Sequence, residues 1–248
     1  PDIDFVIVGS VEEYVSLSSY ENVFIYPLIE RKYENVKIKK HKDQKVIKFG
    51  YHGHWPHLAK FSPHLSKAIE ECNNSILKCE LHIITGEDNP PFPQNAKPDV
   101  PTYFYNYSKI DVTDTIKKFD IGIVPNVTDI GQYVPGLQDS EMPQLGLYKT
   151  DFNLRIKNKT NAGRAYVFYQ HGIPVIHDLS PSSFEIMTKT GFNICAHDKN
   201  SYLREMKKLS SHKFRNIVAS SNKKVFEEFF NPLDHAQKLV NFLKLLKL

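Results

Sequence analysis

Short apolar segments alternate with stretches of helical periodicity along most of this chain, and this alternation is the strongest constraint on its fold. It is typical of βα units, in which helices connect the parallel strands of one sheet. We expect strands near Phe5–Gly9, Val23–Tyr26, Ile47–Tyr51, Glu80–Thr85, Thr102–Tyr105, Ile121–Pro125, Pro174–His177 and Phe192–Ala196. The predicted fold is therefore α/β, with a Rossmann-like parallel sheet that carries helices on both faces.

Apolar periodicity locates the helices between these strands. Residues with the spacing of one helix face follow the Ile47 strand: Leu65, Ile69, Cys72 and Ile76. A second helix is expected from Asp111, which can cap it, to Phe119. The chain is helical and basic from Ser201 onward, and its last helix has an apolar face made of Ala236, Leu239, Val240, Leu243 and Leu246. This face packs against the domain in one interpretation and lies on a membrane surface in the other.

Composition excludes several classes of protein. The 248 residues contain no apolar run near the roughly 20 residues that a membrane-spanning helix needs. The formal net charge of +4 is too small to require a nucleic-acid partner. Cys72, Cys79 and Cys195 form neither a disulfide framework nor a Cys-x-x-Cys metal spacing. Free thiols favour a reducing compartment, so we expect a cytoplasmic protein.

The segment from Glu30 to Lys45 is rich in charge and poor in apolar residues, which indicates a linker. We expect residues 1–40 to form a small leading α/β piece with this linker, and residues 41–248 to form the main domain. The basic side chains of the linker are expected to be solvated. Residues 88–101 and 126–153 predict long loops, and loops at strand ends often carry binding groups.

The stretch from Arg155 to Ile176, RIKNKTNAGRAYVFYQHGIPVI, predicts an anion site. Basic and amide residues precede a helix that Gly172 ends, and the first turn of a helix presents unpaired N–H groups to phosphate. Side chains around this turn add further donors: Lys157, Lys159, Asn161 and Arg164. A basic surface loop before an ordinary αβ unit explains the segment equally well.

A group of histidines follows the Ile47 strand: His52, His54, His57 and His64. They lack an acidic or cysteine partner at a familiar zinc spacing, so no metal site is expected. We expect His54, beside Gly53, to contact phosphate or sugar hydroxyls instead. The sequence also lacks the glycine fingerprint of dinucleotide-binding folds, the Walker lysine loop and the Gly-x-Ser-x-Gly elbow of hydrolases.

From about Lys45 to its end, the chain resembles the C-terminal, nucleotide-sugar-binding domain of the GT-B glycosyltransferases, of the family 4-like kind. The matching segments are KFGYHGH, LHIITG, FDIGIVP and KNKTNAGRAYVFYQHGIPVI, in that order. The resemblance implies that residues 41–248 are this domain, and that residues 1–40 hold the end of the N-terminal, acceptor-side domain and the linker. Only about 35 residues could belong to that N-terminal domain. We expect that its remainder is missing from the sequence, or that a partner subunit supplies it.

The resemblance also implies a set of donor- and phosphate-binding residues: Gly53, His54, Arg155, Lys159, Thr160, Asn161 and Arg164. Pro125 and Asn126 would lie on the side of the nucleotide base. Arg164 would contact a phosphate or make a structural ion pair. No cofactor or metal is implied, and no catalytic residue is identified. Many retaining members carry two glutamates around this helix where the chain has Lys159 and Val167, so the stereochemical outcome is left open.

The implied function is transfer of a sugar from a nucleotide sugar to a glycan, lipid or protein acceptor, as in polysaccharide biosynthesis. A nucleotide-sugar epimerase of the same fold is the nearest alternative enzyme. A non-catalytic module that binds a nucleotide sugar or glycan is the alternative from another class. The basic C-terminal helices would allow a peripheral membrane contact.

Overall fold

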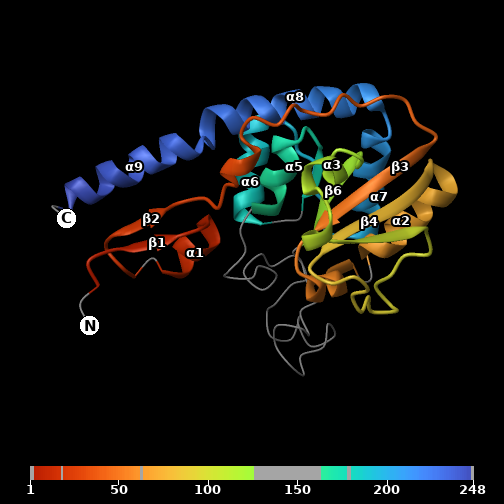
Figure 1. The fold of residues 1–248 in the computed structure, drawn as a ribbon, viewed down its shortest axis with the longest axis horizontal. Coiled ribbons are helices and arrows are strands. Elements are labelled where there is room, and N and C mark those ends of the chain that lie inside the picture. Colours follow the sequence, from red (N-terminus) through yellow and green to blue (C-terminus); the bar gives the residue numbers. More distant parts are fainter. Residues whose placement is uncertain (1–2, 18, 62–63, 126–162, 178–179, 247–248) are drawn as a thin grey trace, which may run out of the picture.

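The computed structural model describes residues 3–17, 19–61, 64–125, 163–177 and 180–246. These residues form two parallel sheets (Figure 1). The small sheet contains β1 (Val6–Val8) and β2 (Val23–Ile25), which α1 (Val11–Ser16) connects. The large sheet contains β3 (Val46–His52), β4 (Lys78–Thr85), β5 (Thr102–Asn106), β6 (Ile121–Val124) and β7 (Val175–His177).

The strand order of the large sheet is β5-β4-β3-β6-β7, and every pair is parallel. In chain order, β4 and β5 therefore extend the sheet on one side of β3, and β6 and β7 extend it on the other side. The reversal of strand order lies between β3 and β6, and ligands of open α/β sheets bind outside the carboxyl ends of the strands at this point. The predicted α/β class with a Rossmann-like parallel sheet is confirmed.

The other described helices are α2 (His64–Ser75), α3 (Val112–Ile116), α5 (Gly163–Gln170), α6 (Pro181–Thr190), α7 (Lys199–Leu209), α8 (His212–Phe229) and α9 (Pro232–Leu245). Short 3₁₀ turns lie at η1 (Arg31–Tyr33), η2 (Trp55–Phe61) and η3 (Tyr107–Lys109). Helices α2 and α7 bury their apolar side chains against one face of the sheet, and α3 and α5 cover the other. Asp111 caps α3 as expected, since its carboxylate accepts from the Asp114 N–H at 2.8 Å.

Most of the expected strands are confirmed, with ends that differ by one or two residues. The strand expected at Phe192–Ala196 is wrong, because this segment makes only an isolated bridge between His177 and Cys195. Ile194 and Ala196 are buried, so the segment is apolar for packing reasons. The chain then turns at once into α7, whose first turn is capped by Asp198.

Two paired glycines let phenylalanine rings approach the sheet closely. Gly50 of β3 and Gly122 of β6 are cross-strand partners. A Cβ atom on Gly50 would lie 2.0 Å from the Phe119 ring, and one on Gly122 would lie 2.6 Å from the Phe168 ring of α5. Both rings are fully buried. The absence of side chains at these positions therefore sets how near α5 lies to β6.

We expect Gly122→Ala to lower the free energy of unfolding by about 1–3 kcal/mol, because the added methyl group would overlap the Phe168 ring and push α5 away. Urea unfolding measures this difference. Gly86→Ala is the matched control, since a Cβ there meets nothing within 4 Å. Equal unfolding midpoints for the two variants would contradict the close approach.

Residues 26–45 connect the two sheets, and we call them the joining segment. This segment is anchored to the large sheet. The expectation that its basic residues are solvated is wrong for Lys39 and His41. The Lys39 ammonium lies 2.9 Å from Asp120 Oδ1, and the Asp120 side chain is fully buried. His41 is also buried, with Nε2 2.9 Å from the carbonyl oxygen of Gly172. Arg215 of α8 donates a hydrogen bond from its Nε to His41 Nδ1 at 3.3 Å. The segment runs along α8 (Figure 1).

Asp120 is the centre of this anchor. Burial alone would raise the pKa of its carboxyl group, but the neighbouring His41 imidazole and the charge of Lys39 outweigh burial and hold this pKa below its usual value. Its second oxygen accepts from the Lys48 N–H of β3 at 3.0 Å. One carboxylate thus connects the joining segment to the central strand.

We expect Asp120→Ala to lower the free energy of unfolding by about 3–5 kcal/mol at neutral pH, because it leaves the Lys39 ammonium buried without its counter-charge. Chemical denaturation gives the value. Asp99→Ala, at an exposed position, removes the same charge and should stay close to the parent protein. A loss below 1 kcal/mol at Asp120 would mean that the joining segment is not held in this way.

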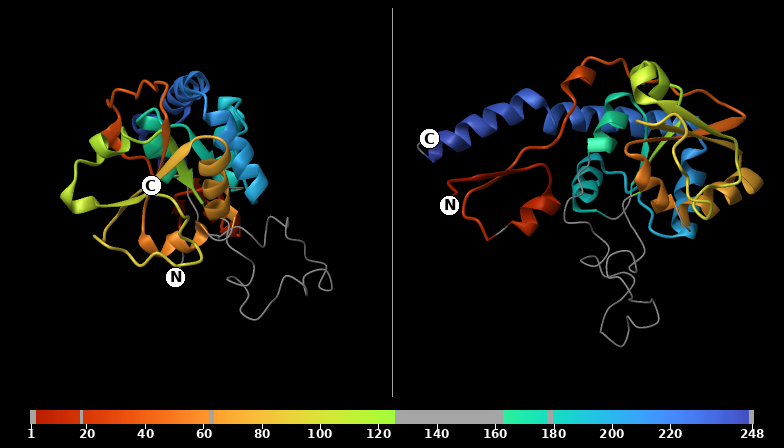
Figure 2. Two further views of the ribbon diagram at one scale, coloured as in Figure 1. Left: turned by 90° about the vertical axis from the view of Figure 1, so that its right-hand side faces the viewer. Right: turned by 60° about the horizontal axis from the view of Figure 1, so that its bottom comes forward.

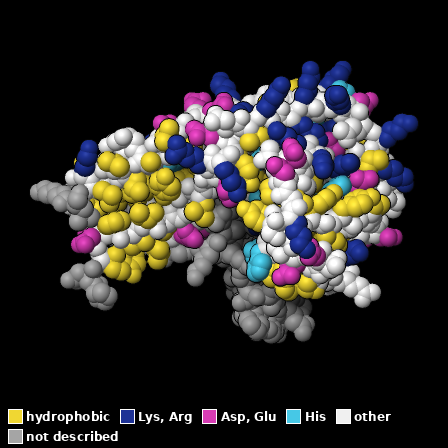
Figure 3. Space-filling model, viewed as in Figure 1, with side chains coloured by type: hydrophobic (Ala, Val, Ile, Leu, Met, Phe, Trp, Pro, Cys, Tyr) yellow, Lys and Arg dark blue, Asp and Glu magenta, His cyan; other side chains and the backbone are white. Residues whose placement is uncertain are grey.

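The last helix covers the small sheet. Phe242 of α9 lies 5.1 Å from Phe24 of β2 and 6.4 Å from Phe5, measured between ring centroids. The right-hand view of Figure 2 also places α9 beside the small sheet. Apolar side chains gather over this region, whereas lysines and arginines gather along α8 (Figure 3). Within the described ranges, every helix is too short or too polar to cross a membrane.

Candidate functional site

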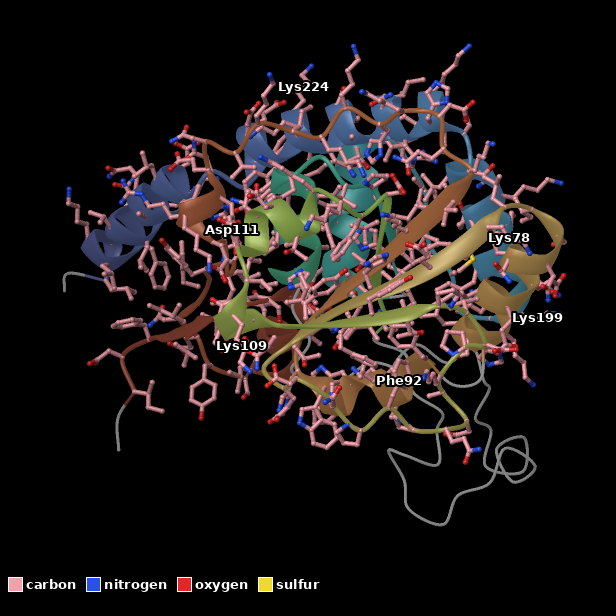
Figure 4. The ribbon with its side chains drawn as sticks, turned by 45° about the vertical axis from the view of Figure 1, so that its right-hand side comes forward. Lys78, Phe92, Lys109, Asp111, Lys199 and Lys224 are labelled. Carbon is pink, nitrogen blue, oxygen red and sulfur yellow. The ribbon has the colours of Figure 1, made fainter. Side chains whose placement is uncertain are left out.

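Two adjoining cavities lie at the carboxyl ends of the strands of the large sheet. We call the first the strand-end cavity; its volume is about 250 Å³, and it lies between the ends of β3, β4 and β5 and the joining segment. We call the second the helix-end cavity; its volume is about 580 Å³, and it lies between residues 26–31 and α5. Figure 4 shows the two ends of the sheet, with Lys109 near the cavities and Lys78 at the opposite end. The cavities share Glu30, His52 and Val167.

The turn after β3 shapes the wall between the cavities. Gly53 has φ +144°, a conformation that favours glycine. Its N–H donates to the carbonyl oxygen of Ile84, and a Cβ atom there would lie 3.1 Å from Arg164 Cδ. The buried Tyr51 hydroxyl donates to the carbonyl oxygen of His54 at 3.0 Å. The turn therefore leaves room for the Arg164 side chain and fixes the backbone at His54.

Arg164 lies in the first turn of the described part of α5 and lines the helix-end cavity. Its Nη1 lies 3.4 Å from the Tyr51 hydroxyl, and its guanidinium carbon is 5.7 Å from the centroid of the Tyr51 ring. A cation in this position adds to the partial positive charge of the helix start. The arrangement suits an anion.

His52 joins β3 to α5 as a neutral ring. Burial lowers its pKa to about 4, and its Nε2 lies 2.9 Å from the carbonyl oxygen of Arg164. The carbonyl group can only accept, so Nε2 carries the proton and donates it. The His52 ring also packs edge-on against Phe168, at 4.8 Å between centroids. His52 thus positions the start of α5 and supplies no positive charge near neutral pH.

We expect the free energy of unfolding to fall as the pH decreases from about 6.5 to 4, because the unfolded imidazole takes up a proton over this range while folded His52 does not. In His52→Gln this dependence should be shallower, although the variant is less stable at pH 7. Urea unfolding at several pH values tests it. Burial lowers the pKa of His177 to about 3, with the same sign, so only part of the slope should disappear. Parallel curves would contradict the assignment.

Several solved structures have a similar arrangement of strands and helices. The structure of TarM superposes with a TM-score of 0.61 at 12% identity, over 97% of this chain and 43% of TarM. The pneumococcal O-GlcNAc transferase GtfA, in complex with UDP and GlcNAc, gives 0.56 at 10% identity, over 98% of this chain and 45% of GtfA. Trehalose-6-phosphate synthase OtsA gives 0.51 at 10% identity, over 89% and 51%.

The fold is that of the GT-B glycosyltransferases. The chain spans about half the length of these proteins or less. No protein-family model and no curated protein sequence matches it. The likeness therefore concerns the fold, whose described part contains the five-stranded sheet and the cavities.

The GT-B structure brings three of the sequence-predicted residues together. Gly53 and His54 line the strand-end cavity, and Arg164 lines the adjoining helix-end cavity. Pro125 is buried directly after β6 and lines neither cavity. The other predicted residues lie outside the described residues: Asn126, Arg155, Lys159, Thr160 and Asn161.

Sequence reasoning missed the joining segment as a wall of the site. Glu30 and Tyr33 line the strand-end cavity, as does Tyr107, which follows β5. The charge-rich composition of this segment suggested a solvated linker, and only the aromatic Tyr33 among the charges indicated burial. In the part of the chain that the structure describes, His, Cys, Asp and Glu side chains form no group of three that could hold a metal.

Proposed function

We propose that this chain is the donor-binding part of a glycosyltransferase that transfers a sugar from a nucleotide sugar to a glycan, lipid or protein acceptor. The observation that carries the proposal is the pair of cavities at the carboxyl ends of β3 to β5, which open at the start of α5 beside Arg164. This is the point where open α/β sheets bind ligands. The UDP and sugar complexes of GtfA and of a Staphylococcus aureus TarM mutant support the choice of ligand.

The reaction would break the bond between the anomeric carbon and the diphosphate oxygen, and the acceptor oxygen would form the new bond to that carbon. The acceptor gives up its proton, and the diphosphate leaves with additional negative charge. Stabilising this charge is the main electrostatic task, and preorganised donors that do so contribute about 10²- to 10³-fold each in rate. We assign this task to Arg164 and the N–H groups at the start of α5, with Lys159 as a further cation. No metal or cofactor is part of the proposal.

We expect Arg164→Ala to weaken binding of a nucleoside diphosphate at least tenfold, because charge-assisted hydrogen bonds to phosphate are stronger than neutral ones. Thermal shift with UDP-, GDP-, CMP-, TDP- and ADP-sugars selects the base, and isothermal titration with the selected diphosphate gives Kd. Lys224→Ala removes a cation from α8, away from both cavities (Figure 4), and should bind like the parent protein. Lys159→Ala is expected to act in the same direction as Arg164→Ala.

Failure of the parent protein to bind any of these compounds would overturn the proposal. Binding without release of the nucleotide, even with a partner chain and an acceptor present, would favour a non-catalytic module. Conversion of the sugar without an acceptor would favour the epimerase. A place in glycan or polysaccharide biosynthesis in the cytoplasm, with peripheral membrane contact through the basic helices, goes with the transferase proposal.

A further inference from the structure

Glu30 has a distinctive place in the site. It lines both cavities, and of the described residues that line them it is the one with a carboxylate. Beside it on the shared wall are Val167, which is apolar, and His52, whose Nε2 is already bonded to the carbonyl oxygen of Arg164. The shared wall therefore has one strong acceptor, and it comes from the joining segment.

The backbone of Glu30 is held firmly against the last turn of α5. Its carbonyl oxygen accepts from Gln170 Nε2 at 2.9 Å. Three residues later, the Tyr33 ring packs against His171 with 4.8 Å between centroids. Gln170 and His171 are both fully buried. These two contacts fix where the Glu30 side chain starts, so its position beside Val167 follows from the packing of α5.

The Glu30 carboxylate is held by a contact that a ligand can replace. Its Oε2 lies 3.1 Å from the Lys32 ammonium, and both side chains are about half exposed, at 50% and 48%. Lys32 also donates at 3.3 Å to the hydroxyl group of Tyr107, which lines the strand-end cavity. Partial burial would lower the pKa of Lys32, but its hydrogen bonds to Glu30 and Tyr107 raise it, so the ammonium stays charged. Exposed ion pairs of this kind contribute little to stability, so giving up the contact would weaken the fold little.

We propose that Glu30 binds a pair of neighbouring hydroxyl groups of the donor, either on its ribose or on the transferred sugar. This inference rests on the proposed function. An ionised carboxylate only accepts hydrogen bonds and has two oxygens, which matches the two donors of a vicinal diol. Lys32 and Tyr107 hold the carboxylate at the cavity wall until the diol replaces the ammonium as its partner. Glu30 is thus a specificity-determining residue. It lies before the sequence segments that resemble the GT-B family.

The test compares three probes on the purified chain by isothermal titration: UDP, 2′,3′-dideoxy-UDP and UDP-N-acetylglucosamine. If the thermal-shift panel selects another base, the matching compounds replace them. Glu30→Gln keeps the size of the side chain and removes its charge. Glu34→Gln is the matched control, because Glu34 lies in the same segment and lines neither cavity. Thermal unfolding confirms that both variants are folded.

If Glu30 binds the ribose, the parent protein should prefer UDP to the dideoxy compound at least tenfold, and Glu30→Gln should reduce this preference below threefold. If Glu30 binds the sugar, Glu30→Gln should leave UDP binding unchanged and weaken UDP-N-acetylglucosamine at least tenfold. Either result supports the inference. Unchanged affinities of Glu30→Gln for all three probes, or an equal loss in Glu34→Gln, would overturn it. Absence of binding by the parent protein would overturn the proposed function itself, and this inference with it.

Discussion

The close approach of α5 to the sheet is the contact on which the site depends. Because Gly122 has no side chain, the Phe168 ring lies directly on β6. The same ring packs against His52, whose Nε2 holds the carbonyl oxygen of Arg164. The position of the guanidinium relative to the turn at Gly53 therefore depends on a glycine in the middle of the sheet, Gly122. The chemistry at the cavity edge is set by packing in the core.

The joining segment is the second element that positions the site. Asp120 and Gly172 hold it at Lys39 and His41, and Gln170 and His171 hold it at Glu30 and Tyr33. Asp120 precedes β6, and the other three groups lie at the end of α5 or just beyond it. One helix therefore places Arg164 at its start and the joining segment at its end, so that both cavities share a single rigid support.

The sequence predicts the parallel sheet well, because strands such as β6 and β7 are buried along their whole length and are rich in Val and Ile. It also singles out Gly53, His54 and Arg164, which the structure places beside the cavities, and their role stays a prediction. It does not predict that the Lys39 side chain is only 12% exposed, since its partner Asp120 is 81 positions away and no local pattern indicates the pair. Glu30 and Tyr107 were missed for the same reason: only the folded chain brings the joining segment to the end of β5. The strand expected at Phe192–Ala196 shows the opposite error. Its apolar residues are buried in the core, but the segment forms no strand.

The polypeptide passes twice between the large sheet and the small one, once through the joining segment and once from α8 into α9. Two covalent connections therefore join the two parts of the molecule. Glu12 of α1, which accepts from the Ser182 N–H of α6 at 3.2 Å, adds a non-covalent contact to these connections. Residues 26–31, which line the helix-end cavity, directly follow β2, so the position of this wall depends on how the small sheet is held.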